Sequence, residues 1–215
     1  MDLLRQVLDF VLHLDRHLHD IISTYGGWTY LLLFATVFCE TGLVITPFLP
    51  GDSLLFAAGT FAATGALRLE WLLLLLATAA ILGDTVNYWI GAALRHRLAD
   101  RGKLRFVKQA HLDRTHAFYE KYGAKTIIIA RFVPIVRTFA PFVAGVGEMS
   151  YRKFMTYNLV GGIGWVLIFV LGGYFFGNLP FVKSNFSLVI LAIIVVSVLP
   201  AVVEFVRARR AAEGT

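Results

Sequence analysis

Five charged residues stand inside segments that are otherwise apolar, where their side chains can bind or exchange ions. They are Glu40, Asp52, Asp84, Arg131 and Arg137. A charge that faces lipid at the centre of a bilayer costs about 2.5–3.5 kcal/mol, so five such charges cost on the order of 12–18 kcal/mol. A whole fold is stable by only about 5–15 kcal/mol. We therefore expect these side chains to face one another, a cavity or a ligand.

The two arginines are candidates for binding a phosphate group. A guanidinium stays charged and donates two parallel hydrogen bonds to phosphate oxygens. We therefore expect Arg131 and Arg137 to bind the phosphate of a substrate. Backbone N–H groups at the start of a short helix after the break at Pro134 would add to the affinity for an anion.

The carboxylates are candidates for proton exchange or gating. A carboxyl group that is shielded from water takes up a proton more readily than one in water, so we expect Glu40 and Asp52 to exchange protons or to release the phosphate. The alternative is that the charges only lock the structure as ion pairs. Both interpretations stay open for Asp84, which shares a helix face with a neighbour three residues on. Supporting polar groups are expected from Asp84, Asn87, Ser53 and Thr138.

The composition predicts an integral membrane protein. Of 215 residues, 58% are hydrophobic and 16% are charged, against about 25% charged in soluble domains. This excludes a soluble nucleic-acid-binding fold and a disordered chain. The single cysteine, Cys39, excludes an intramolecular disulfide. His13 and His17 are four residues apart, but no carboxylate or cysteine set converges on them, so we expect surface histidines and no metal or cofactor.

The positive charge lies in one loop. Residues 95–125 hold nine Lys or Arg against three Asp or Glu, whereas the rest of the chain is balanced, and the formal net charge is +6. Short loops rich in Lys and Arg stay cytoplasmic, so we expect this loop to be cytoplasmic, and three arginines place the tail 207–215 on the same side. The side of the N-terminus stays open.

The hydrophobic pattern divides the chain into helical segments. Residues 1–22 carry apolar side chains at helical spacing among aspartates, which predicts an amphipathic helix at the membrane interface. A single membrane domain is expected over 28–206. A transmembrane helix needs about 20 apolar residues, which predicts transmembrane helices over 71–93, 154–177 and 186–206. Gly173 and Gly177 suit close helix packing, within the chain in preference to a dimer.

The two remaining apolar segments, 28–66 and 126–147, are predicted to be re-entrant hairpins. Because the basic loop and the tail share one side, an even number of crossings separates them, and 154–177 and 186–206 already supply two. The segment 126–147 must then enter and leave on the cytoplasmic side. The segment 28–66 has the same design but leaves on the opposite face, which suggests an inverted repeat. The residues expected to break the helices are Pro47, Pro50, Gly51, Pro134 and Pro141.

Three motifs resemble those of the DedA family of membrane proteins. The stretch 38–53 (FCETGLVITPFLPGDS) is similar to the first signature of the family, and 130–141 (ARFVPIVRTFAP) is similar to the second. Gly83-Asp84 with Asn87-Tyr88 and Gly91 resembles the motif between them. The resemblance runs from about residue 5 to residue 210.

The resemblance implies an all-α membrane fold with two opposed re-entrant hairpins, related to the VTT domain of eukaryotic lipid scramblases. It also implies a bacterial inner membrane protein that serves envelope integrity, depends on the proton motive force and recycles undecaprenyl phosphate. The positions of Glu40, Asp52, Arg131 and Arg137 match the functional charges of the family.

The leading hypothesis is therefore a flippase, not an enzyme, that moves a phosphate-bearing lipid, foremost undecaprenyl phosphate. The expected partners are membrane lipid and protons; nucleic acid is not expected, and a homo-oligomer is left open. The alternatives are a general phospholipid scramblase and a proton-coupled ion or drug antiporter. An intramembrane phosphatase is disfavoured because no histidine lies inside an apolar span. A non-transporting assembly factor is a further possibility.

Overall fold

The computed structural model describes residues 14–43, 51–100, 125–196 and 199, and within these ranges the chain forms α-helices joined by short turns. Several predicted features lie outside them: residues 1–13 of the interfacial helix, Pro47 and Pro50, residues 101–124 of the basic loop, and nearly all of the chain after residue 196. The helices are α2 (Leu14–Tyr25), α3 (Trp28–Gly42), α4 (Gly51–Ala63), α5 (Leu69–Asp100), α7 (Lys125–Ala130), α8 (Pro134–Val146), α9 (Tyr151–Phe176) and α10 (Pro180–Ser184).

Two of the described helices are long and apolar enough to cross a bilayer. They are Leu69–Arg95 within α5 and Tyr151–Phe176, which is α9. Both carry large apolar side chains on their outer faces, such as Leu74, Ile168 and Phe175, each more than half exposed. A soluble protein rarely leaves so much apolar surface in contact with water, so these faces suit lipid. A third apolar helix, Phe186–Val196, reaches the end of the described part of the predicted span 186–206.

The chain forms two compact units. Unit 1 contains residues 1–36, 49–77 and 165–215, and unit 2 contains residues 37–48 and 78–164. The helices α3, α5 and α9 each contribute to both units. α5 continues to Asp100, so the first six residues of the predicted basic loop 95–125 are helical.

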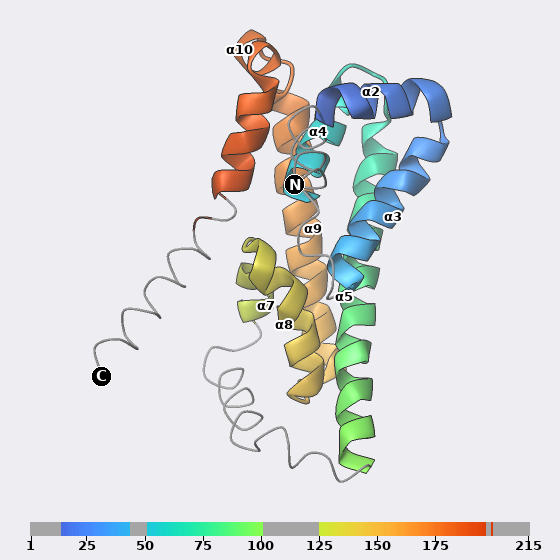
Figure 1. Cartoon of the computed structure of the whole chain (residues 1–215), viewed down its shortest axis with the longest axis vertical. Helices are drawn as coiled ribbons and strands as arrows, with labels where there is room; N and C mark the ends of the chain where they lie inside the picture. Colours follow the sequence, from blue (N-terminus) through green and yellow to red (C-terminus); the bar gives the residue numbers. More distant parts are fainter. Residues whose placement is uncertain (1–13, 44–50, 101–124, 197–198, 200–215) are drawn as a thin grey trace, which may run out of the picture. The chain divides into compact units, whose positions relative to one another are not determined.

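Glycines let α4 and α9 pack backbone to backbone within unit 1, where Figure 1 shows them side by side. A Cβ atom at Gly59 would overlap the carbonyl oxygen of Val170, and one at Gly173 would overlap that of Phe56. The Thr60 hydroxyl donates to the carbonyl of Gly173 at 3.3 Å. Small residues allow such approach in membranes, where packing and hydrogen bonds drive association. The pair of small residues at positions 173 and 177 thus serves packing within the chain, as the sequence favours.

Replacing Gly173 with Ala is expected to destabilise the protein by about 2 kcal/mol, because the added Cβ overlaps rigid backbone. Gly164→Ala is the matched control in the same helix, since no atom of another described element lies within 4 Å of the added Cβ. Alanine favours a helix over glycine, so the control should leave the melting temperature unchanged or higher. Thermal unfolding in detergent checks both variants, and equal melting temperatures would show that the close approach of α4 and α9 carries no energy.

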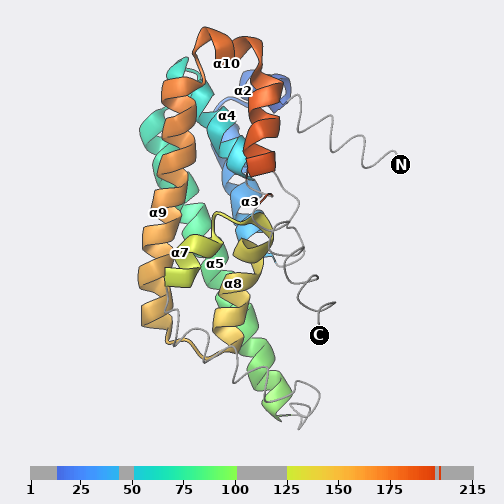
Figure 2. The ribbon, with the colours of Figure 1, turned by 90° about the vertical axis from the view of Figure 1, so that its left-hand side faces the viewer.

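After α9 the chain reverses through α10, and Figure 2 shows the helix that begins at Phe186 running back from α10 in the direction opposite to α9. Pro180 stands in the first turn of α10, where the missing N–H of proline costs nothing. The rings of Phe56 and Phe186 lie 6.4 Å apart, which joins this last helix to α4.

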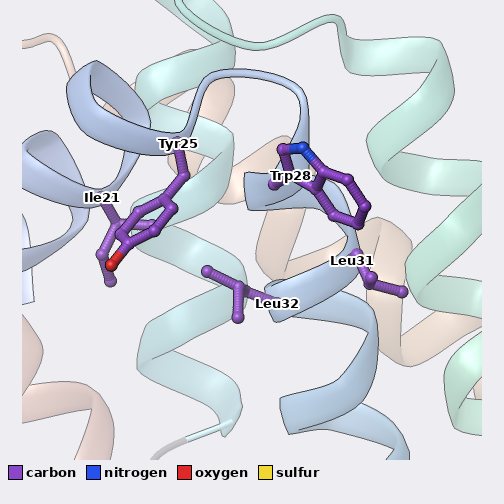
Figure 3. A pocket seen from close by; sticks show the side chains of 5 residues that line it. All are labelled: Ile21, Tyr25, Trp28, Leu31 and Leu32. Atoms are coloured by element: carbon purple, nitrogen blue, oxygen red, sulfur yellow. The ribbon is translucent and has the colours of Figure 1, made fainter.

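The corner between α2 and α3 carries an apolar hollow. The turn passes through Gly26, whose φ of 52° lies in the left-handed region that glycine adopts readily. Figure 3 shows side chains of both helices around a hollow of about 620 Å³ lined by Ile21, Tyr25, Trp28, Leu31 and Leu32. Tyr25 and Trp28 are largely exposed, and such aromatic rings suit the membrane interface. The hollow holds none of the predicted site residues.

In unit 2, α7 and α8 are two short helices that contact each other and meet at a bend, as Figures 1 and 2 show. Their 6 and 13 residues correspond to about 9 and 20 Å of helix, and neither spans the roughly 30 Å of a hydrocarbon core. This is the shape that the prediction for 126–147 requires. The re-entrant path and the inverted repeat stay predictions.

The break in this segment differs from the prediction. The turn falls at residues 131–133, and Pro134 opens α8 rather than interrupting it. Proline at the first helical position is favourable, because its φ suits the helix and its N–H would have no partner there. Pro141 was also expected to break a helix, but α8 continues through it. Packing of α8 on its neighbours outweighs the one hydrogen bond that an internal proline removes. Gly51 is the first residue of α4, so it adjoins a helix start.

The hydrophobic core of unit 2 fixes α5 against α8 and α9. Gly91 meets the carbonyl of Phe142, and Gly145 meets that of Tyr88, so α5 and α8 touch along their backbones. The Tyr88 ring stacks on Phe154 with centroids 4.6 Å apart, and the Tyr88 hydroxyl donates to the carbonyl of Met149. This framework positions the polar side chains that α5, α8 and α9 contribute.

Candidate functional site

The first ion pair of unit 2 joins α3 to α8. Nη2 of Arg137, in the first turn of α8, donates to Oε1 of Glu40, which lies near the end of α3. Glu40 is fully buried and Arg137 is 6% exposed. The partners are 97 positions apart in sequence. Burying either charge alone would be costly, so each stabilises the buried state of the other.

The second ion pair joins α5 to the bend before α8. Nη2 of Arg131 donates to Oδ2 of Asp84 and also, at 2.7 Å, to Oδ1 of Asn158 on α9. Asn158 in turn donates to the carbonyl of Ile81 at 3.0 Å. The guanidinium also lies close against α9 at Gly162, where an added Cβ would stand 3.4 Å from its Nη1 atom. Arg131 is therefore held by an acid, an amide and a close-fitting helix surface.

A buried amide links the two sides of the first ion pair. Nδ2 of Asn87 on α5 donates to the carbonyl of Thr41 at 3.1 Å and to that of Thr138 at 2.7 Å. Thr41 follows Glu40 in sequence, and Thr138 follows Arg137. Asn87 thus links the backbone of the residue after Glu40 to the backbone of the residue after Arg137.

The third carboxylate lies in unit 1. Asp52 stands in the first turn of α4, where the helix dipole favours an anion, and its Oδ1 accepts a hydrogen bond of 2.8 Å from Nε1 of Trp165. Asp52 is 6% exposed, and Trp165 and Ser53 are fully buried.

The structure brings together most of the residues predicted from sequence. Unit 2 contains Glu40, Asp84, Asn87, Arg131, Arg137 and Thr138, and unit 1 contains Asp52 and Ser53. The sequence predicts that the buried charges face one another, a cavity or a ligand, and the structure pairs Arg137 with Glu40 and Arg131 with Asp84.

Two buried side chains that hydrogen-bond the predicted charged residues were missed from the sequence, Asn158 and Trp165. The signal for Asn158 was available, because an amide inside the uncharged apolar span 154–177 needs a polar partner. Nothing in the sequence distinguishes Trp165 from the other aromatic residues of that span. Among the described residues, no group of three His, Cys, Asp or Glu side chains could hold a metal ion.

Among the described residues, the four buried charged side chains of unit 2, Glu40, Asp84, Arg131 and Arg137, form a neutral set of two guanidiniums and two carboxylates. A phosphate oxygen can take the place of a carboxylate on a guanidinium with little change in geometry, since both accept the same N–H donors. An anion entering this buried set adds a net negative charge, which is costly in a medium of low polarity unless a cation or proton accompanies it. The arrangement is thus chemically suited to exchange one anion for another.

Comparison with known proteins assigns the class. The family model described as the VTT domain matches residues 49–175, more than half of the chain. Together with the apolar helices α5 and α9, this match defines a helical membrane protein with a VTT domain.

The chain belongs to the DedA family. It is 54% identical over 214 residues to Protein DedA of Escherichia coli (strain K12), which covers 99% of this chain and 98% of that one. It is 48% identical over 191 residues to an uncharacterized membrane protein of Mycobacterium tuberculosis, 88% of this chain and 84% of that one. It is 36% identical over 154 residues to the inner membrane protein YqjA of Escherichia coli (strain K12), 72% and 70% of the two chains. No solved structure gives a significant match. The predicted family and helical membrane class are confirmed.

Proposed function

We propose that the protein moves a phosphate-bearing lipid between the leaflets of the bacterial cytoplasmic membrane, with undecaprenyl phosphate as the foremost substrate. The observation that carries the proposal is the pair of buried arginines, each held by a carboxylate from another helix, in a protein built for lipid surroundings. An intramembrane charge is costly, so its presence favours a role in binding or transport. The name of the relative YqjA as an inner membrane protein supports the location.

The proposed cycle begins when a lipid phosphate reaches Arg137 or Arg131 and replaces the carboxylate on its guanidinium. Glu40 or Asp84 then loses its counter-charge, and a proton taken up by that carboxylate keeps the buried set neutral. Release of the proton on the other side returns the carboxylate to the arginine and expels the phosphate. This order supports dependence on the proton motive force, with Asp52 of unit 1 as a further proton-exchanging group.

A leaflet-resolved assay in proteoliposomes tests the proposal. The full chain is reconstituted, and movement of undecaprenyl phosphate and of ordinary phospholipids is followed with and without a pH gradient. We expect wild-type protein to move undecaprenyl phosphate faster when the gradient is present. Arg131→Ala and Arg137→Ala should each lower the rate at least tenfold, about 1.4 kcal/mol in the barrier. Arg152→Ala, at an exposed arginine of α9, is the control and should keep the wild-type rate.

Each contrary outcome identifies another function. Unchanged movement in both arginine variants overturns phosphate binding by these residues. Equal rates for every phospholipid indicate a general scramblase, and a cation-driven loss of the pH gradient without lipid indicates an antiporter. Release of inorganic phosphate from the lipid would identify an enzyme.

A further inference from the structure

A buried hydrogen-bond acceptor stands next to the first ion pair. Asn87 is fully buried, and both protons of its Nδ2 group are used on the carbonyls of Thr41 and Thr138. Its Oδ1 atom is buried and has no hydrogen-bond partner among the residues that the structure describes. The acceptor therefore lies beside the backbone that carries Glu40 and Arg137, and it requires a donor.

The orientation of this amide follows from its surroundings. An asparagine carries two N–H donors on one atom and an acceptor on the other, and its hydrogen-bonding partners decide which is which. Both atoms that face Nδ2 are carbonyl oxygens, which only accept. The reversed amide would set its own oxygen against two acceptors and lose both hydrogen bonds. Oδ1 is thus the atom without a partner.

A buried acceptor without a hydrogen bond lowers the stability of the protein. A buried polar group without a hydrogen bond costs about 1–3 kcal/mol, and the asparagine could be replaced by an apolar residue if packing were its only role. A donor supplied by a ligand would remove the cost when the ligand binds. The donors already assigned at this site are guanidinium N–H groups, which suit the anionic oxygens of a phosphate; Oδ1 suits the opposite kind of atom, an oxygen that carries a proton.

Phosphate esters differ in this respect. A monoester loses its second proton with a pKa of about 6, so at neutral and mildly acidic pH part of it carries one P–O–H donor beside its anionic oxygens. A diester of the kind found in ordinary phospholipids has no proton on its phosphate at neutral pH. A site that combines guanidinium donors with a fixed carbonyl acceptor is complementary to the protonated monoester and leaves its acceptor unpaired against a diester.

We propose that Asn87 is a specificity-determining residue, whose Oδ1 accepts a hydrogen bond from the P–O–H group of a lipid phosphate monoester while Arg137 binds its anionic oxygens. The inference rests on the proposed function and deepens it, because it assigns the residue that distinguishes a phosphate monoester from a diester. The same contact brings the proton with the anion, so the protonated headgroup adds only a single negative charge to the neutral set of four charges.

The test compares two lipids that share one chain. A polyprenyl phosphate and its methyl phosphodiester are incorporated separately into phosphatidylcholine proteoliposomes of the full chain, and the rate of movement between leaflets is measured for each. Wild-type protein is expected to move the monoester at least tenfold faster than the diester. The preference should grow between pH 7.5 and about pH 6, because the protonated monoester becomes more abundant as the pH falls toward its second pKa.

Two asparagine variants separate recognition from structure. Asn87→Ala removes the acceptor, so the monoester-to-diester ratio should fall about tenfold, whatever the loss in the two rates. Asn158→Ala is the matched control: it removes a buried amide of the same unit whose oxygen is already engaged by Arg131, so both rates should fall together with the ratio unchanged. If the monoester-to-diester ratio is unchanged in Asn87→Ala, the inference is overturned.

The comparison of the two lipids with wild-type protein tests the inference even if a variant does not fold. Equal wild-type rates for the monoester and the diester overturn the role of Asn87 and leave the movement of phosphate lipids intact. Movement of neither lipid by wild-type protein overturns the proposed function itself. The two failures are therefore distinguishable.

Discussion

Replacing Arg131 alone with Met is expected to lower the free energy of unfolding by about 3–5 kcal/mol, because it leaves the buried carboxylate of Asp84 without its partner. The double replacement, Arg131→Met with Asp84→Leu, removes both charges and should recover part of that loss. Apolar side chains often replace a buried ion pair without cost. A remainder of about 1–3 kcal/mol should persist, because Asn158 Oδ1 loses the donor that Arg131 provides.

Thermal unfolding of the purified full chain in detergent measures this difference. Arg152→Met, at an exposed arginine of α9, is the control and should change the melting temperature little. Asp84→Leu alone should lower the melting temperature as much as Arg131→Met alone, since it leaves the buried guanidinium of Arg131 without its partner. If the double variant is as unstable as either single variant, the ion pair is not what couples α5 to the bend before α8.

The double variant Glu40→Gln with Arg137→Met should fold but reduce lipid movement to the level of protein-free liposomes. Both charges of the first ion pair disappear together, so no buried charge is stranded, and the stability of the protein should change far less than for either replacement alone. The phosphate, however, loses the guanidinium that would bind it, and the proton loses the carboxylate that would carry it. Loss of lipid movement in a variant that remains folded would show that this ion pair belongs to the functional site.

Leaflet-resolved movement of undecaprenyl phosphate, read beside the melting temperature of the same preparation, tests this prediction. Lys125→Met is the control, because Lys125 is an exposed cation at the start of α7. It should preserve both readings. Wild-type movement by the double variant would show that Glu40 and Arg137 form a structural pair only, and the proposal would then have to rest on Arg131.

The two ion pairs differ in ways that bear on their roles. Arg131 contacts Asp84 on α5 and Asn158 on α9 and lies close to α9 at Gly162, so replacing it would disturb both helices and the bend before α8. Arg137 lies in the first turn of the short helix α8, next to the Asn87 amide that bridges its backbone to that of Glu40. The acceptor at Asn87 favours Arg137 as the arginine that meets the substrate, with Arg131 maintaining the bend from which α8 begins.

The family signatures and the five charges in apolar segments could be read from the sequence, because the cost of a charge in lipid depends only on what surrounds it along the chain. The helices α5 and α9 could also be predicted, because a continuous apolar run is a property of the local sequence. The position of the break before α8 could not be read, since proline both opens and interrupts helices and only packing decides between them. Pro141, inside α8, shows the same ambiguity.

By itself the sequence determined the class of the protein, its family and the buried charges, all of which are properties of local composition and motif. Only the tertiary structure decided that Arg131 pairs with Asp84 and Arg137 with Glu40, and that Asn158 also binds the guanidinium of Arg131. Partners 47 and 97 positions apart meet because glycines such as Gly83, Gly91 and Gly145 let helix backbones approach closely. The energetic cost of burying a charge requires that each buried charged side chain has a partner. Which residue is that partner depends on how the helices pack.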